Sequence, residues 1–275
     1  MKILVATGIL FTSLISSAAE SKLYDLMYLP SARTSFGISN LGVVYGRSKV
    51  SRLEVIRSGL QFTQTLGHSL SDRLAVTANL NYVNQKYKFN FSGFSDDSFQ
   101  RRGLSDPSLG LRFRLLENDL LLDFVGGAVI KTGNEESTNN AINNKQGTHS
   151  FKGGLQLGTK AEDFQWAILV QLDHFIRNDN EDAHNSISLQ GDILTKISSQ
   201  MFLRFFVLSR HSLAYHDDDG DETSYTNMYD LGPELLFSLS EKLLLKTGLT
   251  YNTVANISGT DNDTWQLNVG ANYQF

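Results

Sequence analysis

The last eleven residues of the chain, Trp265 to Phe275, read WQLNVGANYQF and alternate apolar and polar side chains without exception. Successive side chains of a β-strand point to opposite faces, so this stretch predicts a strand whose two faces meet different surroundings. The same period of two predicts twelve strands, at 35–47, 53–67, 73–91, 106–116, 119–132, 149–160, 164–177, 184–197, 200–212, 224–239, 242–255 and 263–275. Many of them reach the ~9–11 residues that a tilted strand needs to cross a bilayer.

The connections between these strands alternate in length. Short ones are expected at 69–72, 117–118, 161–163, 198–199 and 240–241, and longer ones at 48–52, 92–105, 133–148, 178–183, 213–223 and 256–262. Tight periplasmic turns and longer extracellular loops are typical of outer-membrane barrels. We therefore predict an all-β fold, a closed antiparallel transmembrane β-barrel of about 12 strands. A secreted β-sandwich is the alternative, but its loops would not alternate so systematically.

The composition excludes several classes of protein. The chain of 275 residues has no cysteine, a net charge of −5 and a mean hydropathy of −0.20. It can therefore hold no disulfide, thiolate metal site or cysteine nucleophile, and its charge gives no general attraction to nucleic acid. In a barrel, the modest hydropathy is the average of a lipid-facing face and a polar face.

The first residues have the features of an export signal. Lys2 precedes the apolar stretch Ile3–Ile15, and Ser17-Ala18-Ala19 offers small residues for cleavage. Residues 1–19 are thus predicted to be a signal peptide. Residues 20–34 are expected to form a periplasmic N-terminal segment or a plug in the lumen, and 35–275 the transmembrane barrel.

The ending resembles the C-terminal signal of Gram-negative outer-membrane barrels, which Tyr273 and Phe275 carry. This resemblance implies the cell outer membrane, insertion by the barrel-assembly machinery, and contact with outer-membrane lipid and lipopolysaccharide. Residues Gly103–Arg112 and Gly126–Gly133 resemble the phenol-degradation (MetA-pathway) outer-membrane family, which pairs a Gly-x-x-Asp strand start with a later Pro-Thr-Gly. Lys131 stands where that family has proline. The second resemblance implies a transport role and no catalytic residues.

If the apolar faces meet lipid, the charged residues of the opposite faces line the lumen. The basic ones are Arg57, Arg112, Arg114, Lys131, Lys152, Lys160, Arg177, Lys196, Arg204, Arg210 and Lys246, and the acidic ones are Asp123, Asp173, Asp192, Asp230 and Glu234. The excess of cations predicts a weak preference for anions. Turn geometry predicts that Arg112 faces Asp123 and that Lys152 faces Asp173.

Two groups of residues are candidates for catalysis and for metal binding. His184 and Ser186 have the spacing used by outer-membrane phospholipases and deacylases, but they are predicted to face inward, so no enzymatic activity is expected. The acidic run Asp217–Glu222 lacks the EF-hand spacing and favours a solvated loop tip over a calcium site. No metal or cofactor is expected.

These features favour a porin-like outer-membrane channel for passive passage of small solutes. Two alternatives stay open: a transporter of small hydrophobic or aromatic compounds, and a plugged barrel with a structural or surface-interaction role. Barrels of about 8 strands are filled by side chains and those of 16–18 leave an aqueous channel, so the strand number lies between these cases.

Overall fold

The computed structural model describes residues 26–27, 29–50, 53–91, 97–132, 137–138, 141–142, 149–160, 162–176, 185–213, 226–256 and 261–275. Within these residues, no helix is long and apolar enough to cross a membrane. The strands are β1 (Ser35–Val50), β2 (Leu53–Ser71), β3 (Leu74–Phe91), β4 (Asp97–Leu104), β5 (Ser108–Glu117), β6 (Leu120–Val129), β7 (Ser137–Thr138), β8 (Ala141–Ile142), β9 (His149–Thr159), β10 (Phe164–Ile176), β11 (Ser186–Ser198), β12 (Met201–Ser212), β13 (Thr226–Ser240), β14 (Leu243–Asn256) and β15 (Asp261–Gln274).

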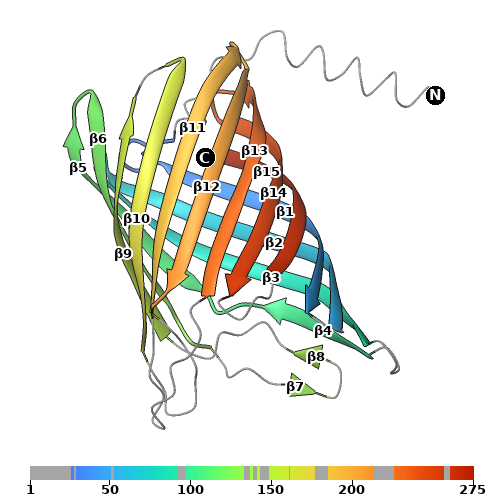
Figure 1. Ribbon diagram of the computed structural model, residues 1–275. Helices are drawn as coiled ribbons and strands as arrows, with labels where there is room; N and C mark the ends of the chain where they lie inside the picture. Colours follow the sequence, from blue (N-terminus) through green and yellow to red (C-terminus); the bar gives the residue numbers. More distant parts are fainter. Residues whose placement is uncertain are drawn as a thin grey trace.

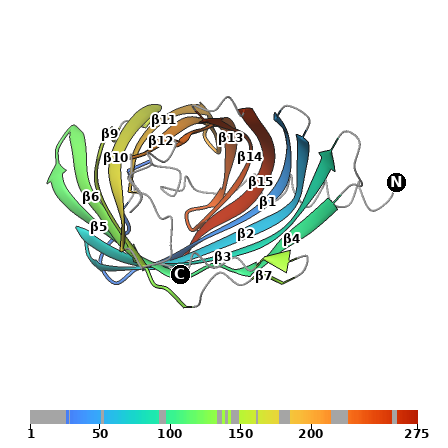
Figure 2. The ribbon, with the colours of Figure 1, turned by 60° about the horizontal axis from the view of Figure 1, so that its bottom comes forward.

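The strands form a closed antiparallel barrel (Figures 1 and 2). Each neighbour in the ring is the next long strand along the chain, and β15 pairs with β1 to close it, from Phe36 opposite Gln274 to Ser48 opposite Asn262. Both β4 and β5 pair with β3, so together they occupy one position in the wall. Counted in this way the wall has twelve positions, and the predicted fold class is confirmed.

The alternation of short and long connections is also observed, with one exception. Two-residue turns such as Asp72-Arg73, Asn118-Asp119 and Glu241-Lys242 gather at the upper end of Figure 1, which we call the short-turn end. The other end carries the longer connections and is called the loop end. The predicted longer connection at 48–52 is wrong, because β1 and β2 stay paired up to Val50 opposite Leu53.

The predicted loop at 92–105 is wrong in a second way. Its residues Asp97–Leu104 form β4, which continues the wall along the outer part of β3. The strand then breaks at 105–107, where Pro107 has no N–H to give to a ladder and Ser105 donates its backbone N–H to the Asn81 carbonyl at 2.7 Å. The predicted loop at 133–148 contains the short strands β7 and β8, and β8 pairs parallel with β4.

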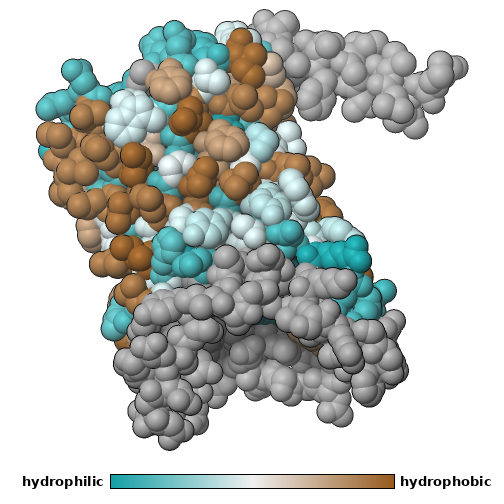
Figure 3. All heavy atoms as spheres, viewed as in Figure 1, coloured by the Kyte–Doolittle hydropathy of each residue, from teal (hydrophilic) through white to brown (hydrophobic). Residues whose placement is uncertain are grey.

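The two faces of the wall differ as the sequence predicts. On β1, Leu41, Val43 and Tyr45 are 45–55% exposed on the outer face, while Val44 between them is 2% exposed. Figure 3 shows apolar side chains covering the wall above the loop end. Such an outer face is suited to hydrocarbon, and the buried face is turned to the lumen.

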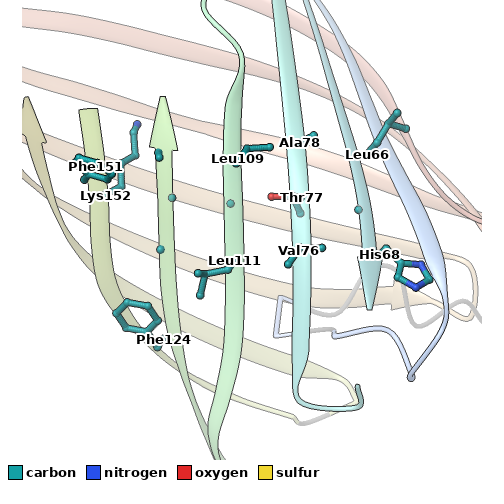
Figure 4. Close-up of a pocket in the computed structure, with 15 residues that line it drawn as sticks. Leu66, His68, Val76, Thr77, Ala78, Leu109, Leu111, Phe124, Phe151 and Lys152 are labelled. Carbon is teal, nitrogen blue, oxygen red and sulfur yellow. The ribbon is translucent and has the colours of Figure 1, made fainter. Parts of the chain in front are cut away.

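The outer face is hollowed over β2, β3, β5, β6 and β9. The hollow has a volume of about 870 Å³ and is lined by outward apolar side chains such as Leu66, Leu109 and Phe151 (Figure 4). It exists because Gly126 and Ala128 present almost no side chain to this face. The wall therefore offers lipid a concave apolar surface here.

Pro233 interrupts the ladder between β13 and β14 without changing its register. Leu231 faces Tyr251 and Glu234 faces Gly248 with the same offset, and the pairs between them are missing. Gly232 lies in the gap, where an added Cβ would be 1.9 Å from the Leu249 carbonyl oxygen. The close approach of the two backbones requires glycine at this position.

Candidate functional site in the barrel lumen

The most deeply buried charges lie in the lumen near the short-turn end. Asp123 on β6 is 0% exposed and Arg114 on β5 is 4% exposed. Arg114 Nε donates to Asp123 Oδ1, and Arg112 Nε donates to Oδ2 at 2.5 Å. One buried carboxylate thus accepts hydrogen bonds from two guanidinium groups, and Glu117 lies 3.8 Å from Arg114 as a second acidic partner.

The predicted facing of Arg112 and Asp123 is wrong in register, although the two residues do form an ion pair. Arg114 is the residue opposite Asp123, and Arg112 is opposite Val125. The register differs from the prediction for two reasons. The turn is formed by Asn118-Asp119 and not by residues 117–118, and β5 has a bulge between Arg114 and Leu116. Arg112 reaches the carboxylate diagonally because its side chain is long.

The N-terminal segment enters the lumen at this cluster. Arg114 Nη2 donates to the Met27 carbonyl at 2.5 Å, and Met27 is only 1% exposed. Leu26 donates its backbone N–H to Oε1 of the buried Gln165 at 3.0 Å. Residues before the first strand therefore occupy part of the lumen cross-section.

Apolar side chains surround the inserted segment. Leu26 packs against Leu194, Phe202, Leu236 and Leu244, and also against the group formed by Met27, Leu121 and Ala167. These residues, buried between β6, β10, β11, β12, β13 and β14, form the only hydrophobic clusters found in the described part of the chain. The inserted segment is therefore held in the lumen by apolar packing near the short-turn end.

A second ion cluster lies on β11, β12 and β13. Arg204 Nη2 donates to Asp192 Oδ1 at 2.5 Å, and its Nη1 donates to Glu234 Oε2 at 2.6 Å. The guanidinium also lies over the Phe206 ring, 5.5 Å from the centroid. This arrangement is the reverse of the first cluster, because here one cation serves two carboxylates.

Lys152 and Asp173 face each other across β9 and β10, as predicted. Their Nζ and Oδ2 atoms are 3.8 Å apart, and Gln171 Nε2 donates to Asp173 Oδ1 at 2.7 Å. The pair is partly hydrated, with the lysine side chain 38% exposed. It therefore braces the wall less tightly than the arginine clusters do.

Toward the loop end, the inner face of β2, β3 and β4 is aromatic and basic. The rings of Tyr87 and Phe99 stack at 4.5 Å with an interplanar angle of 2°, and Phe89 stacks on Phe99 at 5.4 Å. Arg57 lies over Tyr87 at 5.7 Å and donates from Nε to Gln85 Oε1 at 2.9 Å. This flat surface with a cation at its edge could hold a planar anion.

Sequence reasoning missed Arg101 in this group, because its segment was taken for a loop. Arg101 is directly opposite the buried Gln85, so it shares the inner face. Arg101 Nε and Gln85 Nε2 are both buried without a hydrogen-bond partner among the described residues. The signal in the sequence was the alternation from Asp97 to Leu104, which is short and follows a glycine- and serine-rich stretch.

The remaining predicted lumen residues are distributed along the wall. Asp230 accepts a hydrogen bond from Asn252 Nδ2, and the backbone N–H of Lys131 donates to His149 Nδ1 at 3.1 Å. Lys160 pairs with Glu117 at 3.4 Å and Lys196 with Asp163 at 3.9 Å, both at the short-turn rim. Arg177, His184 and the run 217–222 lie outside the described residues, as does the segment 1–19.

Basic charge remains in the lumen after the ion pairs are counted. Within the described ranges, four inward cations have no carboxylate within 4.0 Å: Arg57, Arg101, Arg210 and Lys246. Arg210 Nε is buried and has no hydrogen-bond partner there. By contrast, Asp123, Asp173, Asp192 and Glu234 each contact a cation. The unpaired charge along the described lumen is therefore mainly positive.

The remaining predictions concern Ser186, the C-terminal residues and metal binding. Ser186 is 5% exposed and faces inward opposite Asp173, as predicted. Phe275 donates its backbone N–H to the Ser35 carbonyl at 2.9 Å, and Tyr273 accepts a hydrogen bond from Gln64 Nε2 at 2.9 Å. Among the described side chains, no group of three or more His, Asp or Glu residues could hold a metal ion.

Comparisons with known proteins agree with this architecture. No family model and no curated protein matches the sequence. Among solved structures, the chain is similar to the COG4313 outer-membrane channel from Pseudomonas putida F1, with a TM-score of 0.70 and 14% identity over 93% of this chain and 100% of that chain. This likeness shows the fold, a twelve-stranded barrel of the kind found in outer-membrane channels.

Two further structures resemble it more distantly. The translocator domain of the autotransporter NalP from Neisseria meningitidis has a TM-score of 0.47 at 10% identity, covering 100% of this chain and 98% of that chain. The CymD monoaromatic hydrocarbon channel has a TM-score of 0.45 at 8% identity, covering 90% of this chain and 89% of that chain.

Proposed function

We propose that the protein is an outer-membrane channel for small solutes with a weak preference for anions. The observation that carries this proposal is the set of inward cations with no carboxylate within 4.0 Å among the described residues, Arg57, Arg101, Arg210 and Lys246, in a closed barrel. Fixed positive charge in a narrow lumen raises the local concentration of anions and excludes cations. The inserted Leu26-Met27 segment limits the size of the solute.

The reversal potential of single channels in a salt gradient tests the selectivity. The matched pair is Arg101→Gln and Arg102→Gln, because these neighbours on β4 point to opposite faces of the wall. We expect Arg101→Gln to move the reversal potential toward zero and Arg102→Gln to leave it unchanged. A cation preference in the unmodified protein would refute the anion preference, and absence of any conductance would favour the plugged, structural barrel.

A second candidate, uptake of small aromatic compounds, is favoured by the stacked rings of Tyr87, Phe99 and Phe89 beside Arg57. Such a surface would bind an aromatic carboxylate by stacking and charge together. Benzoate should then block the ion current more strongly than acetate does, and Phe99→Ala should remove the difference. Equal block by the two anions would contradict this candidate.

The location and assembly of the chain belong to the same proposal. An outer-membrane barrel has its short turns in the periplasm and its longer loops outside. We infer export by the segment 1–19, insertion by the barrel-assembly machinery through Tyr273 and Phe275, and contact with lipid and lipopolysaccharide. The resemblance to the phenol-degradation family supports the transport role. Deletion of Phe275 should lower the amount of folded barrel in outer-membrane fractions.

A further inference from the structure

Three polar side chains on β12 and β13 form a connected chain near the loop end. Ser209 Oγ lies 2.7 Å from Nε2 of His211, and Nδ1 of His211 lies 2.6 Å from Oδ1 of Asn227. An amide oxygen can only accept, so Nδ1 carries the imidazole proton and donates it to Asn227. Nε2 is then unprotonated and accepts a hydrogen bond from the Ser209 hydroxyl.

This is the order of groups that activates a serine nucleophile. A neutral imidazole accepts the serine proton at Nε2 while a third group at Nδ1 fixes its tautomer and orientation. Asparagine fills the third position in papain-like proteases, and the constellation recurs on unrelated folds. The atoms of Ser209, His211 and Asn227 meet the distance criterion for both contacts.

The strand geometry explains how the three residues meet. Ser209 and His211 are two apart on β12 and share a face, and His211 is directly opposite Asn227 on β13. Val207 and Leu189, which follow on the same face, are 42% and 50% exposed and apolar. The triad therefore points away from the lumen, on the outer face of the wall near the loop end.

The same outer face offers room for a hydrocarbon chain. Leu231 is opposite Val207 and lines a hollow of about 270 Å³ with Leu249, Tyr251 and Trp265. The hollow is apolar because its lining is apolar, and Gly232 and Pro233, where the ladder pairs are missing, add no polar side chain to it. An acyl chain seated there would have its polar end toward the loop end, where the triad lies.

We propose that Ser209, His211 and Asn227 form the active site of an acyl-ester hydrolase that acts on membrane lipids at the outer face of the barrel. This activity goes beyond the channel function and uses none of the lumen residues. Lipid ester bonds lie between the headgroups and the hydrocarbon, and the triad lies toward the loop end of the lipid-facing wall. Phospholipids and acylated lipid A share this chemistry.

The reaction balances without a cofactor. Ser209 Oγ attacks the ester carbonyl while its proton passes to His211 Nε2, and the leaving alcohol takes that proton as its C–O bond breaks. Water then attacks the acyl-serine, gives its proton to Nε2 and releases the fatty acid, which regenerates Ser209. Tyr229 is directly opposite Ser209, with its ring edge-on to His211 at 6.0 Å, and we assign its phenol as the donor to the oxyanion.

The decisive experiment uses the full barrel in detergent and in lipid vesicles. A fluorophosphonate probe should label the unmodified protein on Ser209, and Ser209→Ala or His211→Ala should lower hydrolysis of p-nitrophenyl laurate by at least about 100-fold. Retained folding of each variant is checked by its resistance to SDS before heating. Absence of labelling, or labelling that survives Ser209→Ala, would overturn the proposal.

The chain provides a matched control in a second serine–histidine contact. Ser35 Oγ lies 3.0 Å from His68 Nδ1 at the short-turn end, and no described third side chain orients that imidazole. Ser35→Ala should leave both labelling and hydrolysis unchanged. Vesicles of phosphatidylethanolamine and vesicles containing lipid A then distinguish the two lipid sources. Turnover of p-nitrophenyl acetate alone would overturn the assignment to lipids.

Asn227 positions the imidazole of His211 and does not touch the substrate. Its test therefore needs a readout that misfolding would not imitate. Asn227→Leu should lower kcat with little change in KM. Asn227→Asp should restore the rate and move the rising limb of the pH–rate profile to higher pH, because a carboxylate stabilises the protonated imidazole. An unchanged pH profile in Asn227→Asp would exclude the contact to His211 from the reaction.

Discussion

At the scale of single residues, the wall is held by a few carboxylates that each satisfy several donors. Asp123 is the extreme case, with no exposed surface and two arginines bound. Asp123→Asn would remove the carboxylate that both arginines contact, with Arg114 keeping its longer contact to Glu117 at 3.8 Å. We expect the free energy of unfolding to fall by about 3 kcal/mol, measured by urea unfolding in lipid vesicles.

Lys160 is the control for this substitution. It pairs with Glu117 at 3.4 Å, but its side chain is 59% exposed. Since water screens such a pair, Lys160→Ala should change stability by no more than about 1 kcal/mol. Equal effects of the two substitutions would show that the pairing with Asp123 does not stabilise the barrel.

At the scale of the strands, β13 carries the sharpest local exception to the ladder. Gly232→Ala would bring a methyl group against the Leu249 carbonyl and force β13 and β14 apart. The expected loss of stability is about 1–3 kcal/mol. Gly191→Ala on β11 is the matched control, because nothing lies within 4 Å of an added Cβ there. Protection of the β14 amides from hydrogen exchange, compared between the two variants, checks the local cause.

The strands were predictable from sequence because each faces lipid on one side and the lumen on the other. Turn geometry also placed Lys152 correctly opposite Asp173. It failed at the turn between β5 and β6, where a bulge shifts the register, so Arg114 and not Arg112 is opposite Asp123. The break of the fourth wall position at Pro107 was also missed, because a strand that stops and resumes resembles a loop followed by a strand.

The triad was missed for a related reason. Ser209 and His211 share an apparent outer face with apolar residues, but Asn227 belongs to the next strand, beyond a long connection. The spacing of two residues along one strand indicated His184 and Ser186 as the candidate serine–histidine pair instead. Asn227 reaches the imidazole of His211 only because of the register between β12 and β13. The sequence alone does not determine this register, because a long connection joins the two strands.

At the scale of the whole molecule, the inserted N-terminal segment determines how open the lumen is. Leu26 and Met27 fill space between the two apolar clusters. Deletion of residues 20–30 should raise the single-channel conductance, because this space then fills with water. It should also lower stability, since Arg114 and Gln165 lose their contacts with the segment. An unchanged conductance would place the constriction elsewhere.

The seam between β1 and β15 has a consequence for folding order. It joins Phe36 to Gln274, residues at opposite ends of the barrel sequence, and Phe275 adds a further bond to Ser35. Until this last pairing forms, the sheet has two long unsatisfied edges, which are templates for aggregation. The contact spans almost the whole chain, so its loop-closure entropy is among the largest the fold must overcome. Ring closure is therefore expected as the slow, final step of folding.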